Sequence, residues 1–213
     1  MSDARDVQER TGEAFELGER LTVIGRQLRP GEPAPPFELD CLDAPDGALG
    51  PVDLADSRGY VRLLNVINSI DTPVCHVESR RWEERLASGP ARLYTVSMDL
   101  PFALARWRVG EGVTHQLLSS HRDERFGRDY GVLIKEWRML QRAVFVIDAG
   151  DRIVHAEYVA DQMREPDYDA AVAAVEAASR PPTDAGEALP SFRVPPQTPP
   201  LTDEMVRGAS EEA

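Results

Sequence analysis

The sequence is poor in cysteine and has no long apolar run. Two cysteines among 213 residues are too few for a fold built on disulfides, and there is no Cys-x-x-Cys pair of a dithiol reductase. No segment approaches the about 18 apolar residues of a membrane-spanning helix. The N-terminus, residues 1–6, is polar and acidic, unlike a secretory signal. We therefore expect a cytoplasmic protein that does not insert into membranes.

Basic residues are also scarce relative to acidic ones. The chain has 24 Lys and Arg against 37 Asp and Glu, for a net charge of −13, which disfavours binding to nucleic acid or anionic membranes. Its four histidines lack metal-site spacing, and there is no glycine-rich phosphate loop. We expect no metal and no cofactor.

The order of apolar segments predicts an α/β domain. Residues 15–24 read as a hairpin around Gly18, and residues 60–67 as a strand buried on both faces. Further strands are expected at 37–42, 92–97, 114–118, 142–147 and 153–159, and helices at 73–87, 101–109, 123–130 and 166–178. The last two strands form an antiparallel pair with a tight turn. The helix at 73–87 is expected to bury Val74, Val77, Trp82 and Leu86.

Composition divides the chain into three parts. Residues 1–12 are expected to be a flexible N-terminal segment, and residues 13–179 a single domain. Residues 180–213 form an acidic tail whose seven prolines exclude a packed helix or a central strand. The tail is either disordered or an extended segment that clasps the domain or a dimer partner.

Cys75 occupies the most informative position. It follows the buried strand and the sequence Asp71-Thr72-Pro73-Val74, in which Thr72 suits a helix N-cap and Pro73 the first helical position. Cys75 then lies in the first helical turn, where unpaired backbone N–H groups and the helix dipole favour a thiolate over a thiol. The pattern predicts a nucleophilic cysteine, although a lone cysteine can equally be a small buried apolar residue.

Four blocks of sequence resemble the bacterial thiol peroxidases, the atypical two-cysteine branch of the peroxiredoxins. The blocks are Ser69–Cys75, Met98–Ala103, Arg142–Asp148 and Glu165–Ala171, in the family's order. The resemblance covers about residues 13–178 and implies a thioredoxin-like fold, with a central mixed sheet flanked by helices and an N-terminal β-hairpin. It also implies a homodimer, in which Trp107 and Trp137 either anchor the interface or pack within the monomer.

The resemblance assigns roles to individual residues. Cys75 is the peroxidatic nucleophile that attacks a peroxide and becomes a sulfenic acid. Arg142 holds the thiolate and the peroxide oxygens, unless it serves only in a salt bridge at the start of a strand. Thr72 offers its hydroxyl and backbone to the peroxide as well as capping the helix, unless it only caps. The pocket around them is expected to include Asn68, Asp71, Pro73 and Val74.

Two positions depart from the family pattern. Asn68 stands where peroxiredoxins usually have a proline, and Arg108 stands at the position of the resolving cysteine. The usual internal disulfide partner is therefore missing, and an external thiol or a thioredoxin-like protein is the expected reductant. Cys41 is either a buried strand residue or a substitute resolving cysteine, which requires Cα atoms within about 7 Å.

Two other functions fit the same residues. The chain can be a redox sensor whose sulfenic acid forms a mixed disulfide with a partner, or a regulatory or binding protein that has lost activity. Asn68 and Arg108 favour the inactive protein, whereas retention of Thr72, Cys75 and Arg142 favours a working peroxidase.

Overall fold

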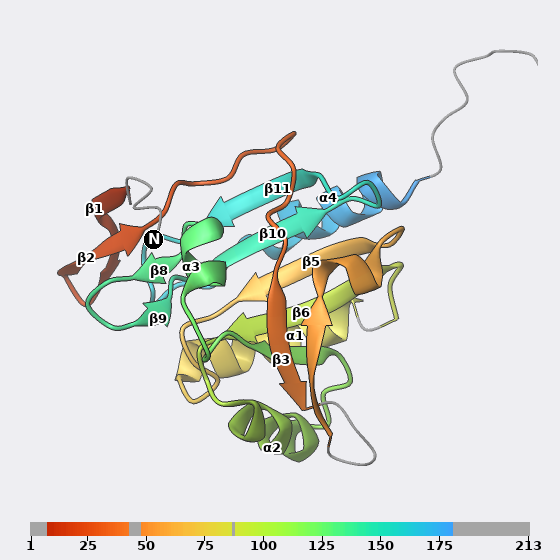
Figure 1. The fold of residues 1–213 in the computed structure, drawn as a ribbon, viewed down its shortest axis with the longest axis horizontal. Helices are drawn as coiled ribbons and strands as arrows, with labels where there is room; N and C mark the ends of the chain where they lie inside the picture. Colours follow the sequence, from red (N-terminus) through yellow and green to blue (C-terminus); the bar gives the residue numbers. More distant parts are fainter. Residues whose placement is uncertain (1–7, 43–47, 87, 181–213) are drawn as a thin grey trace, which may run out of the picture. The chain divides into compact units, whose positions relative to one another are not determined.

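The computed structural model describes residues 8–42, 48–86 and 88–180 (Figure 1). A seven-stranded mixed sheet has the strand order β11-β10-β5-β6-β7-β3-β4, and a smaller antiparallel sheet has the order β1-β2-β8-β9. The strands are β1 (Glu9–Glu16), β2 (Glu19–Ile24), β3 (Glu38–Leu42), β4 (Leu49–Asp53), β5 (Val61–Val66), β6 (Ala91–Ser97), β7 (Gln116–Ser119), β8 (Leu133–Ile134), β9 (Met139–Leu140), β10 (Ala143–Ile147) and β11 (Ile153–Tyr158). The helices are α1 (Pro73–Leu86), α2 (Pro101–Glu111), α3 (Arg125–Asp129) and α4 (Tyr168–Ser179), with a 3₁₀ turn, η1 (Leu54–Ser57).

This arrangement confirms the predicted α/β thioredoxin-like fold and its N-terminal hairpin. β1 and β2 are antiparallel and turn at Leu17 and Gly18, which both have positive φ. Residues 9–12, which the sequence assigned to a flexible segment, belong to β1 instead, because they continue its pairing with β2 as far as Ile24. The expected tail, apart from Arg180, lies outside the described residues.

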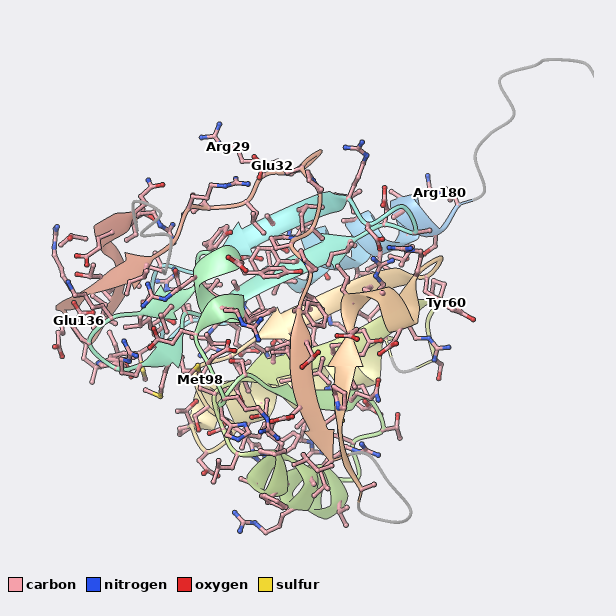
Figure 2. All side chains as sticks on the ribbon, in the orientation of Figure 1. Arg29, Glu32, Tyr60, Met98, Glu136 and Arg180 are labelled. Carbon is pink, nitrogen blue, oxygen red and sulfur yellow. The ribbon has the colours of Figure 1, made fainter. Side chains whose placement is uncertain are left out.

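β5 is the central strand, and its six residues are all buried, as predicted. Val61 and Leu63 face a core cluster that includes Trp82 of α1. Leu64 and Val66 face a second cluster on the opposite side of the sheet, beneath α3. The strand is thus covered on both faces, and the loop of residues 67–72 leads from its C-terminal end to α1. Tyr60, expected as its first residue, precedes β5 and is half-exposed (Figure 2).

The buried face of α1 differs from the prediction. Trp82 and Leu86 are buried as expected, but Val77 is exposed and Val74 is only half-buried. Glu78 is buried instead, because Arg142, which directly precedes β10, pairs with its carboxylate. The sequence prediction counted only apolar positions, so it could not identify a buried glutamate on this face of α1.

Three strands were missing from the sequence prediction. β4 contains Gly50 and Pro51, which read as strand breakers, yet it pairs with β3 at an edge of the sheet. β8 and β9 have two residues each and are too short to show an alternating pattern. Among the described residues, no helix has the length and apolar character that a membrane crossing requires.

Candidate active site

Cys75 is the third residue of α1, and its side chain is fully buried. Pro73 opens the helix, and the carbonyl of Thr72 accepts the bond from the His76 amide at 3.0 Å. The backbone N–H groups of this first turn are those that a helix leaves without internal partners. The thiol also belongs to an apolar cluster with Ile67, Ile70, Leu104, Val113 and Leu117, against which Trp107 packs. The sulfur therefore lies between the N-terminal turn of α1 and a cluster of apolar side chains.

Asp99 fixes the loop that leads into α1. Its Oδ1 accepts a hydrogen bond from Ser69 Oγ at 2.8 Å, and its Oδ2 accepts from the Ile70 amide at 2.8 Å. Ser97 Oγ also donates to Oδ2, at 2.8 Å. Bonds to a carboxylate are about twice as strong as neutral ones, so this residue ties the loop before Cys75 to the end of β6.

The Thr72 hydroxyl differs from the predicted side-chain cap. It donates to the carbonyl of Ser69 at 3.1 Å, so it closes the preceding turn, while the backbone carbonyl of Thr72 begins the helix. Of the other expected pocket residues, Asp71 and Pro73 are exposed and Val74 is half-buried. These three side chains are thus less buried than that of Cys75.

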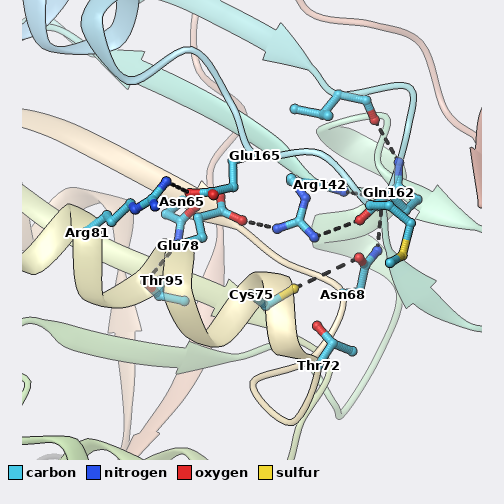
Figure 3. Close-up of polar contacts among 12 residues, drawn as sticks. Asn65, Asn68, Thr72, Cys75, Glu78, Arg81, Thr95, Arg142, Gln162 and Glu165 are labelled. Carbon is cyan, nitrogen blue, oxygen red and sulfur yellow. Dashed lines mark hydrogen bonds and ion pairs between the residues drawn. The ribbon is translucent and has the colours of Figure 1, made fainter.

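Arg142 is buried beside α1 and is held by two partners. Its Nη1 donates to Glu78 Oε2 in a salt bridge whose side chains are 1% and 0% exposed. Its Nη2 donates to the carbonyl of Gln162 at 2.9 Å. Its Nε and Glu78 Oε1 lack hydrogen-bond partners among the described residues. Glu78 lies one helical turn after Cys75 on α1. Its salt bridge therefore holds Arg142 against the helix that carries the thiol (Figure 3).

Asn68 connects the arginine to the cysteine. Its Oδ1 lies 4.0 Å from Cys75 Sγ, and its Nδ2 donates to Gln162 Oε1 at 3.0 Å. The same Gln162 oxygen accepts from the Arg142 amide at 2.9 Å. Asn68 thus contacts Cys75 directly and reaches Arg142 through Gln162, and Figure 3 shows the four side chains close together.

Sequence reasoning missed Glu78 and Gln162. Glu78 follows Cys75 by three positions, a spacing that places both on one helical face, so its position gave a usable signal. Gln162 lies in an irregular segment between β11 and α4 and has no periodicity to mark it.

Cys41 is buried on β3 in a different core cluster from that of Cys75. The structure has no disulfide between the two cysteines. The two candidate interface tryptophans pack within the chain: Trp107 donates to His76 Nδ1 at 3.1 Å, and Trp137 packs against the cluster of β1, β2 and β8. Both rings are half-buried, so each makes internal contacts and keeps part of its surface exposed.

A second buried polar network supports the far side of α1. Asn65 Nδ2 lies 3.3 Å from Thr95 Oγ1, which lies 2.9 Å from His115 Nε2. His115 Nδ1 lies 2.6 Å from Glu83 Oε2. Burial lowers the pKa of His115 against the opposing effect of Glu83, which is consistent with a neutral ring that donates to the carboxylate. Burial raises the pKa of Glu83, but hydrogen bonds from Thr114 and His115 outweigh it and bring the pKa to about 2.

The network predicts a loss of stability in acid. Both pKa values are lower in the folded state, so the stabilisation by His115 is present above about pH 6.5 and that by Glu83 above about pH 4.5. Each contribution is lost as pH falls towards the folded-state value. Urea unfolding at pH 7, 5 and 3 should therefore show a falling free energy of unfolding, with a smaller fall in Glu83→Gln. An equal fall in both proteins would contradict this assignment.

The chain was compared with known proteins. A family model described as the AhpC/TSA family matches residues 30–156. A thiol peroxidase of Halalkalibacterium halodurans is 44% identical over 163 residues, which cover 76% of this chain and 95% of the relative. A thiol peroxidase of Bacillus subtilis is 41% identical over 162 residues, or 75% of this chain and 94% of the relative.

Solved structures agree with these relatives. A peroxiredoxin-like protein from Aquifex aeolicus superposes with a TM-score of 0.70 at 28% identity, covering 81% of this chain and 98% of that one. A thiol peroxidase from Chromobacterium violaceum gives a TM-score of 0.68 at 26% identity, covering 78% and 97%. This chain therefore covers nearly the full length of both structures.

Proposed function

The chain belongs to the AhpC/TSA family, and we propose that it is a thiol-dependent peroxidase that reduces hydrogen peroxide or organic hydroperoxides. The observation that supports this most is the position of Cys75, in the first turn of α1 and linked through Asn68 and Gln162 to Arg142. A reactive thiol needs donors that favour its anion, and this turn supplies them.

The first half-reaction is a nucleophilic displacement on oxygen. The Cys75 sulfur attacks the terminal peroxide oxygen, so an S–O bond forms while the O–O bond breaks. Sulfur loses two electrons and becomes a sulfenic acid, and the peroxide is reduced to water or an alcohol. The proton of the thiol ends on the departing oxygen.

Catalysis requires positive charge near the departing oxygen, where negative charge develops. We assign this role to Arg142, which lies above α1 and is held by Glu78 and Gln162. We assign to Thr72 the contact with the incoming peroxide, since its half-buried hydroxyl lies in the turn before Pro73. Cys75 is fully buried in this structure, so a peroxide can reach its sulfur only if neighbouring groups move.

The second half-reaction uses an external thiol, such as a thioredoxin-like reductant. Arg108 occupies the resolving position on α2, and Cys41 belongs to a different core cluster from Cys75. After one equivalent of peroxide, non-reducing peptide mapping should find a sulfenic acid or its trapped adduct on Cys75. A dominant Cys41–Cys75 bridge would make Cys41 the resolving cysteine instead. We place the protein in the cytoplasm, because this mechanism depends on a supply of reduced thiol.

A redox sensor is the second candidate. The full burial of Cys75 favours it, because a protected sulfenic acid persists long enough to meet a partner thiol. Capture of one partner protein as a mixed disulfide, together with slow peroxide turnover under excess thiol, would support the sensor over the peroxidase.

We also propose a homodimer that forms near the start of α2. Leu100 and Phe102 are 55% and 61% exposed there, next to Asp99, which holds the loop before Cys75. Light scattering at micromolar concentration should give twice the chain mass, and Phe102→Asp should give monomers. Val109→Asp is the matched control, because Val109 is 82% exposed near the other end of the same helix. A monomeric unmodified protein would contradict the dimer.

A further inference from the structure

The N-terminal hairpin is bonded to the segment that holds Arg142. Phe15, near the end of β1, donates its amide to the carbonyl of Ala160 at 2.8 Å, and its own carbonyl accepts from the Gln162 amide at 2.9 Å. These two bonds form a parallel bridge between Phe15 and Asp161. Residues 159–167, all of them described, connect β11 to α4 and apart from this bridge form no helix or strand. The hairpin is therefore a backbone partner of an otherwise irregular segment.

The pairing within the hairpin leaves the backbone of Phe15 available for this bridge. Phe15 lies opposite Arg20 in the register of β1 and β2. Residue pairs in an antiparallel ladder alternate between those that bond to each other and those whose amides and carbonyls point away from the partner strand. Phe15 and Arg20 are a pair of the second kind, because the amide and carbonyl of Phe15 bond to residues 160 and 162. The bridge is thus additional to the hydrogen bonds that form the hairpin.

Gln162 connects the hairpin to Arg142. Its backbone amide bonds to Phe15, whereas its backbone carbonyl accepts from Arg142 Nη2 at 2.9 Å (Figure 3). Its side-chain Oε1 accepts from the Arg142 amide at 2.9 Å, and its Nε2 donates at 3.2 Å to the Ala160 carbonyl that also accepts from Phe15. Gln162 is 2% exposed and Arg142 is 1% exposed, so water has little access to replace a lost bond.

The guanidinium of Arg142 needs both of its supports. Glu78 on α1 accepts from Nη1, and the Gln162 carbonyl accepts from Nη2. A planar group that is bonded at one nitrogen can pivot about that contact, whereas bonds at two nitrogens fix its plane. The orientation of the guanidinium therefore depends on where the backbone of Gln162 is held.

We propose that Phe15 is a positioning residue, whose backbone acts through Gln162 to fix the Arg142 guanidinium and thereby sets the rate at which peroxide oxidises Cys75. The proposal rests on the proposed function, in which Arg142 stabilises the charge on the departing oxygen. A displacement of about 1 Å at a reacting centre can cost about a hundredfold in rate. Loss of one of the bonds that hold Gln162 should cost about tenfold.

The test removes the amide hydrogen of Phe15 and compares two reactions of Cys75. Proline has no amide hydrogen, so Phe15→Pro removes the bond to Ala160. In a Cys41→Ser background, Cys75 is the single cysteine, and its oxidation by hydrogen peroxide and its alkylation by iodoacetamide are measured separately. Oxidation should slow about tenfold, whereas alkylation should change less than about twofold, because iodide leaves without a donor at a departing oxygen. Equal falls in the two rates, or unchanged oxidation, would overturn the proposal.

Arg20→Pro is the matched control. Arg20 is the partner of Phe15 in the hairpin, and its amide also points away from the opposite strand. On that side of β2, β8 pairs at Val23 and Ile24, towards the other end of the strand. The control therefore puts the same ring into the hairpin but leaves the bridge to residues 160–162 in place. Both rates should match those of the parent, and oxidation as slow as in Phe15→Pro would overturn the proposal.

A mutant cycle tests whether Phe15 acts through the arginine. When Glu78→Met and Arg142→Met are already present, Phe15→Pro should slow oxidation no further, because the guanidinium that it positions is absent. The same fall in both backgrounds would overturn the proposal.

A second variant serves if Phe15→Pro fails to fold by near-ultraviolet circular dichroism. Gly18 has a φ of 88°, which a valine adopts only with strain, so Gly18→Val loosens the hairpin turn without altering residues 160–162. It should slow oxidation and leave alkylation unchanged. Unchanged oxidation in Gly18→Val would then overturn the proposal.

Amide hydrogen exchange tests the link without any peroxide. In Phe15→Pro the amides of Gln162 and Arg142 should exchange faster, while that of Val144, on β10 between β5 and β11, should keep its parent rate. An Arg142 amide that exchanges at the parent rate would overturn the proposal. If the parent protein consumes no peroxide but the exchange changes as expected, the activity fails and the link from the hairpin to Arg142 stands. If the parent consumes peroxide and Phe15→Pro oxidises equally fast, the activity stands and the role of Phe15 fails.

Discussion

Replacing Cys75 by serine is expected to reduce peroxide consumption by at least about a thousandfold, because loss of a catalytic nucleophile removes the reaction path itself. A serine hydroxyl is isosteric but is not ionised by a helix N-terminus at neutral pH. The rate is measured as loss of hydrogen peroxide or of an alkyl hydroperoxide with excess dithiothreitol. Retained consumption in Cys75→Ser would refute the assignment of the nucleophile.

Cys41→Ser is the control for that measurement. Cys41 is 4% exposed and belongs to the core cluster on the other side of the sheet, so its replacement should leave peroxide consumption unchanged. A sulfenic-acid trap should label Cys75 in the parent protein and in Cys41→Ser. If Cys41→Ser slows turnover while its first oxidation step is unchanged, Cys41 takes part in resolution.

Local signals in the sequence were sufficient to predict the position of Cys75. The apolar run at 60–67, followed by Thr72 and Pro73, predicted a central strand and a helix start, and the structure has β5 and α1 there. Both features depend on residues close in sequence, whose propensities act within one or two turns.

Contacts between distant segments could not be predicted in the same way. Arg142 and Glu78 are 64 positions apart, and Asn68 and Gln162 are 94 apart. The sequence offers no periodicity that pairs such residues, so the resemblance marked Arg142 but not the partners that hold it. The prediction that Val77 is buried failed for the same reason, because Glu78 is buried only through its distant partner.

Replacing Glu78 by glutamine is expected to destabilise the protein by about 3–5 kcal/mol, because it leaves the Arg142 guanidinium buried without a counter-charge. The substitution keeps the volume of the side chain and changes its charge. Urea unfolding at pH 7 with a tryptophan fluorescence signal measures the loss, since Trp82 is buried on the same helix.

The matched control is a surface ion pair of the same helix. Arg85 Nη1 lies 2.6 Å from Asp169 Oδ1, but Asp169 is 88% exposed, so Asp169→Asn should cost no more than about 1 kcal/mol. A similar cost for Glu78→Gln would mean that the buried pair contributes no more than an exposed one.

The double variant Glu78→Met with Arg142→Met separates stability from activity. Two apolar side chains of similar length remove both buried charges, so most of the lost free energy of unfolding should return. Peroxide consumption should stay low, because the double variant lacks the guanidinium that we assign to the departing oxygen. Recovery of both stability and activity would show that Arg142 serves only as the partner of Glu78, and the positive charge at the site would then have to come from the first turn of α1.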